Sequence, residues 1–165
     1  MKFRRALPLD LKALTDIYNY EILNGTATFD EIPKTVAQRH NWLEAHNHDG
    51  HPLIVSINDH DEVTGFASLS AYGAKDAFKT TAELSVYVAK EHRGLGLGTA
   101  LTREILKIAR DEGQLHLIIS VITHGNMASC KMHQALGFQY QGTIPQIAKK
   151  FDTFLGVDFY TLTID

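Results

Sequence analysis

The sequence predicts an α+β or α/β domain built around one mixed sheet. Three observations support this fold class. The chain has 165 residues, the length of one ordinary domain, and no linker or repeat divides residues 1–165. Its apolar share of 44% and charged share of 21% are typical of a globular protein. Finally, two segments with helical spacing come early, and strands and helices then alternate along the chain.

The first half of the chain predicts two helices among several strands. Residues 3–6 read as a short strand, and Asp10 is placed to cap a helix that runs to about residue 23. Thr35 is placed to cap a second helix that ends near Gly50. Residues 52–57 and 63–69 then read as a hairpin, and residues 81–88 as a further strand.

The second half alternates helix and strand. Residues 98–111 carry apolar side chains at helical spacing, and Gly113 is placed to end that helix. Residues 115–122 are apolar and β-branched, which predicts a strand buried on both faces. Asn126 begins a helix that reaches Leu136, and residues 138–143 and 157–164 are late strands.

Composition and charge exclude several classes of function. A net charge of −3 argues against a dedicated nucleic-acid binder. One cysteine cannot form an internal disulfide, and no Cys/His cluster has zinc spacing, so no metal is expected. No signal peptide or membrane span is visible, so we expect a cytoplasmic protein with no membrane partner. Nine histidines are unusual, and those in the polar early segments are expected at the surface, namely His40, His46, His48, His51 and His60.

A glycine-rich loop at residues 93–98 is the most informative segment. It follows an apolar strand and leads into a helix. Backbone N–H groups of such a loop and the positive end of the helix dipole favour a pyrophosphate. The P-loop lysine is missing after Gly98, and the glycine spacing does not fit a Rossmann fingerprint. The loop instead reads Arg-x-x-Gly-x-Gly, beginning at Arg93.

This loop is the pyrophosphate-binding pattern of the GNAT N-acetyltransferases, and the chain resembles that superfamily along nearly its whole length. The strand Glu-Leu-Ser-Val-Tyr-Val at residues 83–88 and the Met-His pair at residues 132–133 resemble the phosphinothricin and methionine-sulfone acetyltransferase group. The resemblance implies a mostly antiparallel sheet with helices on both faces. It implies acetyl transfer from acetyl-CoA to the primary amine of an amino acid or an analogue, by direct attack on the thioester. Members are commonly homodimers.

The resemblance also implies roles for individual residues. Glu83 matches the position that accepts the proton of the amine, although a strand glutamate can also be merely salt-bridged at the surface. His133 stands where many members have a tyrosine that protonates the thiolate, so it is either the general acid or a residue that packs on the cofactor. Asn126 can cap its helix as well as contact CoA. The expected CoA contacts are Val86, Tyr87, Val88, Arg93, Gly94, Leu95, Gly96, Leu97, Gly98, Thr99, Asn126 and Ser129.

The acceptor side departs from the group. Gly73 stands where members have an arginine for the substrate carboxylate, and Lys75 or Lys79 could substitute without the bidentate geometry of arginine. The late motif keeps Lys150 but has Phe154 in place of a tryptophan. Two alternative functions therefore stay open, a non-catalytic acyl-CoA sensor and a protein N-acetyltransferase. The expected substrate contacts are Phe29, Glu83, Ser85 and Lys75.

Overall fold

A computed structural model describes residues 1–165 and contains one seven-stranded sheet. The strand order is β1-β2-β3-β4-β5-β7-β6, and β4 and β5 form its only parallel pair. The mixed, mostly antiparallel sheet expected from the resemblance is therefore confirmed. The strands are β1 (Lys2–Arg5), β2 (Leu53–Ile57), β3 (Val63–Ala71), β4 (Thr81–Val88), β5 (Leu117–Thr123), β6 (Gln139–Lys150) and β7 (Thr153–Thr163).

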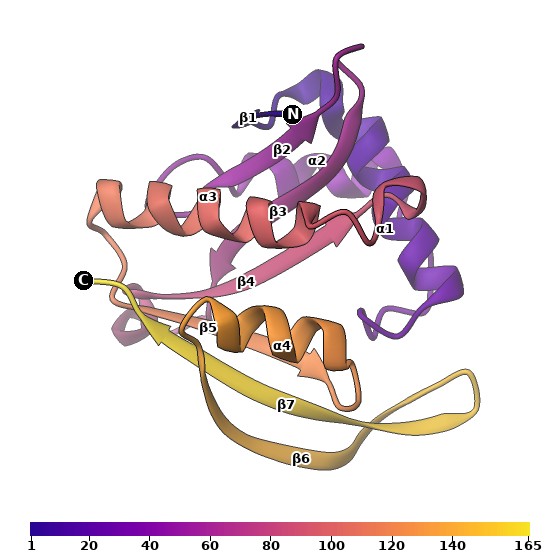
Figure 1. The fold of residues 1–165 in the computed structure, drawn as a ribbon, viewed down its shortest axis with the longest axis vertical. Coiled ribbons are helices and arrows are strands. Elements are labelled where there is room, and N and C mark those ends of the chain that lie inside the picture. The colour runs from indigo at the N-terminus through magenta and orange to yellow at the C-terminus, as the bar shows by residue number, and fades with distance from the viewer.

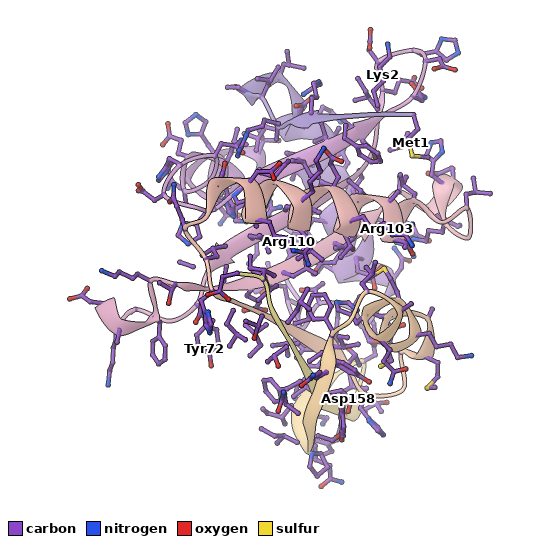
Figure 2. All side chains as sticks on the ribbon, turned by 60° about the vertical axis from the view of Figure 1, so that its left-hand side comes forward. Met1, Lys2, Tyr72, Arg103, Arg110 and Asp158 are labelled. Atoms are coloured by element: carbon purple, nitrogen blue, oxygen red, sulfur yellow. The ribbon has the colours of Figure 1, made fainter.

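Four helices cover the two faces of the sheet (Figure 1). α3 (Leu97–Glu112) and α4 (Met127–Ala135) lie over one face and bury the larger apolar cluster, which includes Leu101, Ile105 and Ile118. α1 (Leu11–Asn24) and α2 (Val36–Glu44) cover the other face and bury a smaller cluster around Leu14 and Phe66. The exposed side chains of Arg103 and Arg110 lie along α3 (Figure 2). No helix is long and apolar enough to cross a membrane.

Two helix ends agree with the capping residues predicted from the sequence, and two predictions need correction. Thr35 accepts a hydrogen bond from the Gln38 N–H, and Gly113 ends α3 in the left-handed conformation. Asp10 makes no side-chain cap for α1, because its carboxylate accepts the Leu7 N–H and pairs with Arg4. The second helix ends at Glu44, well before Gly50, since left-handed residues follow it.

The late hairpin is longer than predicted. β6 runs on to Lys150 and β7 begins at Thr153, because the chain turns at Phe151 and Asp152, both with positive φ. Two-residue hairpin turns need such φ values, and a phenylalanine at the first position gives no sequence signal for one. Pro145 lies within β6 at a register shift, where a proline is tolerated. The hairpin reaches well beyond the rest of the sheet (Figure 1).

The prediction that the strand at residues 115–122 is buried on both faces is wrong. Side chains on one face of β5 are fully packed, as Ile118 shows, whereas Val121 on the other face is exposed. Successive side chains of a strand point to opposite faces, and the face that carries Val121 is the less covered one. Residues 120–123 of β5 line a cleft.

Candidate active site

The cleft opens where β4 and β5 separate. These strands pair only from Thr81 to Glu83 on β4, against Leu117 to Ile119 on β5. β4 continues to Val88, so its edge at residues 84–88 faces a cleft of about 560 Å³ instead of a neighbouring strand. A free strand edge offers alternating N–H and C=O groups to an extended ligand, as in β-strand addition.

The glycine-rich loop borders one end of the cleft. Gly94 and Gly96 both have positive φ, and α3 begins directly after Gly96. A Cβ at either glycine would meet no atom within 4 Å, so these positions are glycine because of backbone conformation and not because of crowding. The open space lies at the N-terminal end of a 16-residue helix, which attracts an anion.

The Arg93 side chain fastens the loop to α1. Its Nε donates to the Val88 carbonyl at 3.0 Å, and its Nη2 donates to Glu21 Oε2 at 3.1 Å. The buried Glu21 carboxylate also accepts the Ala27 N–H at 3.1 Å. Glu21 therefore ties the segment at residues 25–29 to the glycine-rich loop, a link that the sequence did not suggest.

Glu83 lies in the cleft at the last paired position before the strands diverge. Its carboxylate makes no ion pair, and burial raises the pKa of the carboxyl above its usual range. Ser85 and Phe29 line the same cleft. A half-buried carboxylate with a raised pKa and no fixed partner is suited to accept a proton.

The segment that carries Phe29 is held from both sides. The Tyr18 hydroxyl contacts Thr28 Oγ1 at 3.0 Å and donates to the Asp30 carboxylate. The buried Lys150 ammonium donates to the Thr28 carbonyl at 2.9 Å. Burial, together with Asp30, raises the pKa of Tyr18 to about 12, so this hydroxyl stays protonated. The part of the cleft wall that carries Phe29 is therefore fixed by hydrogen bonds.

Two residues expected at the site lie elsewhere. Lys75 is exposed in the loop after β3 and does not line the cleft. Gly73 adopts a positive φ, and a Cβ there would lie 3.1 Å from the Phe78 ring, so a side chain at this position would be strained. The Leu95 side chain is 73% exposed and borders a separate small pocket. The cleft is lined by the other predicted residues, namely Phe29, Glu83, Ser85, Val86, Tyr87, Val88, Arg93, Gly94, Gly96, Leu97, Gly98, Thr99, Asn126, Ser129 and His133.

The start of α4 closes the other side of the cleft. Asn126 caps this helix by accepting the Ser129 N–H at 3.2 Å, and both residues line the cleft. The capping function is therefore present, and it leaves both residues in reach of a ligand.

His133 is buried and both of its ring nitrogens are engaged. Nδ1 lies 2.8 Å from the Ser129 carbonyl, and Nε2 lies 2.9 Å from Ser120 Oγ. A carbonyl only accepts hydrogen bonds, so we assign the proton to Nδ1 and make Nε2 the acceptor from the Ser120 hydroxyl. Burial lowers the pKa of His133, which is therefore neutral near pH 7. Ser120 lines the cleft as well and was not foreseen.

The cradle for an anion, the free strand edge and the unpaired carboxylate define an acyltransferase that uses a CoA thioester. Comparison with known proteins gives the family. Residues 15–138 match the model of the acetyltransferase (GNAT) family, and the chain belongs to this family. The resemblance predicted from the sequence is thereby confirmed.

Individual relatives are similar over nearly the full chain. An L-methionine sulfoximine/L-methionine sulfone acetyltransferase of Pseudomonas paraeruginosa is 37% identical over 94% of this chain and 90% of its own. The phosphinothricin acetyltransferase of Sinorhizobium meliloti, solved in complex with acetyl-CoA, is 31% identical with a TM-score of 0.94, over 99% of this chain and 88% of its own. A ribosomal-protein-alanine N-acetyltransferase structure from Brucella melitensis is 37% identical with a TM-score of 0.94, over 99% of both chains.

Proposed function

We propose that this protein transfers the acetyl group of acetyl-CoA to the primary amine of an amino acid or an amino-acid analogue. The observation that carries the proposal is the position of Glu83. Its carboxylate stands where β4 and β5 diverge, beside the free strand edge and at the far end of the cleft from the glycine-rich loop. The names of the methionine sulfone and phosphinothricin relatives support an acceptor of this class.

Different parts of the cleft would bind different parts of acetyl-CoA and the acceptor. The N–H groups of residues 94–98 and the start of α3 would hold the pyrophosphate, and the free edge of β4 would bind the pantetheine amides. Acetyl-CoA supplies an activated thioester when bound. Glu83 takes the proton of the acceptor ammonium, directly or through one water, so that the free amine attacks the thioester carbon. The C–S bond then breaks, and CoA leaves as the thiol with the remaining proton that the attacking amine loses. The raised pKa of Glu83 makes its carboxylate a stronger base for this step.

For His133 we propose packing and positioning in place of general acid catalysis. The Nδ1 proton is committed to the Ser129 carbonyl, and the neutral ring has no second proton to give. His133 and Ser120, the hydroxyl that it holds, both line the cleft. We leave Lys75 out of the proposed acceptor site, because it does not line the cleft.

The direct test measures release of CoA thiol with acetyl-CoA and a panel of amines. The panel pairs each amino acid with its amide and includes a short peptide with N-terminal alanine, because the name of the Brucella relative favours that second acceptor. We expect turnover with amino acids and loss of turnover in Glu83→Gln near pH 7, recovering in part at high pH, where the free amine is abundant. Acetyl-CoA binding without turnover on any amine would overturn the proposal in favour of a sensor. Turnover on the peptide alone would favour a protein acetyltransferase.

We also propose a homodimer in the cytoplasm. The β6–β7 hairpin presents exposed apolar side chains, among them Ile144, Ile147, Phe151 and Phe154. Exposed apolar side chains on a projecting hairpin are typical of an interface. We propose that a second copy of the chain packs against these side chains. A cytoplasmic location agrees with the use of acetyl-CoA and with the free, buried thiol of Cys130.

A further inference from the structure

One of the histidines expected at the surface is buried against Ser70 of β3. His46 follows α2 and is 6% exposed, which corrects the expectation from its polar segment. Its Nδ1 lies 2.6 Å from the Trp42 carbonyl, and its Nε2 lies 2.9 Å from Ser70 Oγ. Its ring also packs at 5.0 Å from the Trp42 ring, which fixes its orientation.

Ser70 connects this histidine with the cleft. Ser70 on β3 is the direct cross-strand partner of Glu83 on β4. Directly opposite side chains of antiparallel strands share one face, with Cβ atoms about 4.5–5.5 Å apart. The Ser70 hydroxyl and the Glu83 carboxyl therefore lie side by side on this face, although no hydrogen bond joins them in the structure. Ile119 of β5, on the other side of Glu83, is apolar and offers no hydrogen bond.

The direction of these hydrogen bonds follows from their acceptors. The Trp42 carbonyl can only accept, so the proton of neutral His46 is on Nδ1, and Nε2 accepts from Ser70. The only hydroxyl hydrogen of Ser70 is then used, and lone pairs alone remain for Glu83. Those lone pairs can accept from a protonated carboxyl but offer nothing to a carboxylate. A hydrogen bond made only to the neutral form of an acid favours that form.

We propose that His46 is a positioning residue that, through Ser70, raises the proton affinity of Glu83. Glu83 remains the group that contacts the acceptor amine, and His46 acts by holding the Ser70 hydroxyl as an acceptor. This inference rests on the proposed function for its catalytic meaning. The titration of the carboxyl can nevertheless be measured whether or not Glu83 is the base.

The charge state of His46 is consistent with this arrangement. Burial lowers the pKa of His46, and the nearby charges of His51, Arg39 and His48 act in the same direction, while the Trp42 carbonyl opposes them. The ring is therefore neutral near pH 7. No ion pair reaches Glu83, so no charged neighbour competes with Ser70 for its carboxyl.

The test is a carboxyl ¹³C NMR titration of Glu83 in the full chain, assigned with Glu83→Gln. Ser70→Ala removes the acceptor and lowers the titration midpoint by about 0.5–1 pH unit. His46→Phe keeps a ring beside Trp42 but releases the Ser70 hydroxyl to donate to the carboxylate, so the midpoint falls further. The double variant returns to the Ser70→Ala value, since no hydroxyl remains. The matched control Ser68→Ala, another buried β3 serine on the same face, leaves the midpoint unchanged.

The outcomes separate the inference from the proposed function. An unchanged or raised midpoint in His46→Phe overturns the inference, as does a double variant that differs from Ser70→Ala. If Ser70→Ala does not fold, Ser70→Thr keeps the hydroxyl and is expected to keep the wild-type midpoint, while His46→Phe still decides. The apparent pKa on the acidic side of the pH profile of kcat/KM is expected to move with the NMR midpoint. Midpoints that shift as expected while this apparent pKa stays fixed support the inference and count against Glu83 as the base.

Discussion

Gly96 offers a sharp test of the anion site, because charge can be changed there at constant shape. Gly96 has a φ of +78°, and a Cβ would point into open space at the start of α3. Asn and Asp are the side chains that best tolerate this backbone, and strain at such positions is of the order of 1–2 kcal/mol for an L-residue. Gly96→Asn and Gly96→Asp therefore carry similar strain and differ by one charge.

The size of the charge effect follows from Coulomb's law. A carboxylate about 5 Å from a phosphate charge costs about 1 kcal/mol in water and about 3 kcal/mol at an effective dielectric constant of 20. For a pyrophosphate at this exposed loop we expect about 2 kcal/mol, which is about a 30-fold weaker Kd for Gly96→Asp than for Gly96→Asn. The difference is expected to shrink as salt is raised, since the loop is open to solvent.

Calorimetric titration with CoA at low and high salt measures this difference. Gly113 provides the matched control, because it has a φ of +62° and open space but lies at the far end of α3. Gly113→Asp and Gly113→Asn are expected to bind CoA alike, with a similar loss of stability. Equal affinities of the two Gly96 variants would refute the assignment of the loop to an anion.

Three further predictions concern the supports of the cleft. Glu21→Gln loses the ion pair to Arg93, which is partly exposed. We expect a loss of stability of about 1–2 kcal/mol in denaturant unfolding and weaker CoA binding in calorimetry. Unchanged unfolding would show that this ion pair is dispensable. Because the pKa of Glu83 is raised in the folded state, the folded protein binds the carboxyl proton more tightly than the unfolded chain does. The resulting contribution to the free energy of unfolding is present below the unfolded pKa and is lost as pH rises through the folded pKa. Glu83→Gln should therefore be more stable than the wild type at pH 8 but not at pH 4, and equal melting temperatures at pH 8 would contradict the burial of this carboxylate. Phe154→Asp places a charge on the apolar hairpin, and light scattering should show a monomer where the wild type is a dimer; a wild-type monomer, or a variant that stays dimeric, would count against this interface.

Much of the fold could be predicted because local signals agreed with the tertiary structure. The strand at residues 81–88 has the predicted bounds, and Thr35, Gly113 and Asn126 lie at helix ends as expected. These residues act within a few positions of themselves, through a cap or a left-handed φ, so the sequence alone reveals them. The turn at Phe151 and Asp152 could not be predicted in this way, because the hairpin imposes a positive φ on Phe151, which has no turn preference.

The loop at residues 93–98 and the strand that begins at Glu83 were enough to predict the family and its use of acetyl-CoA. These segments act through consecutive backbone groups, so the sequence alone is enough to recognise them. The acceptor side is different, since its walls come from α1, β5 and the β6–β7 hairpin, which meet only in three dimensions. The contacts of Glu21 with Arg93 and of Lys150 with Thr28 join residues far apart in the chain, and no spacing rule predicts them.

The histidines show the same division. Sequence alone placed His46 and His51 among polar residues and predicted surface positions, and it could not choose between two roles for His133. The tertiary structure buries His46 and His133 and gives each a carbonyl on Nδ1 and a serine hydroxyl on Nε2. Composition counts ionisable groups, but burial and hydrogen-bond partners decide their charge, because desolvation acts only once distant segments have packed around them.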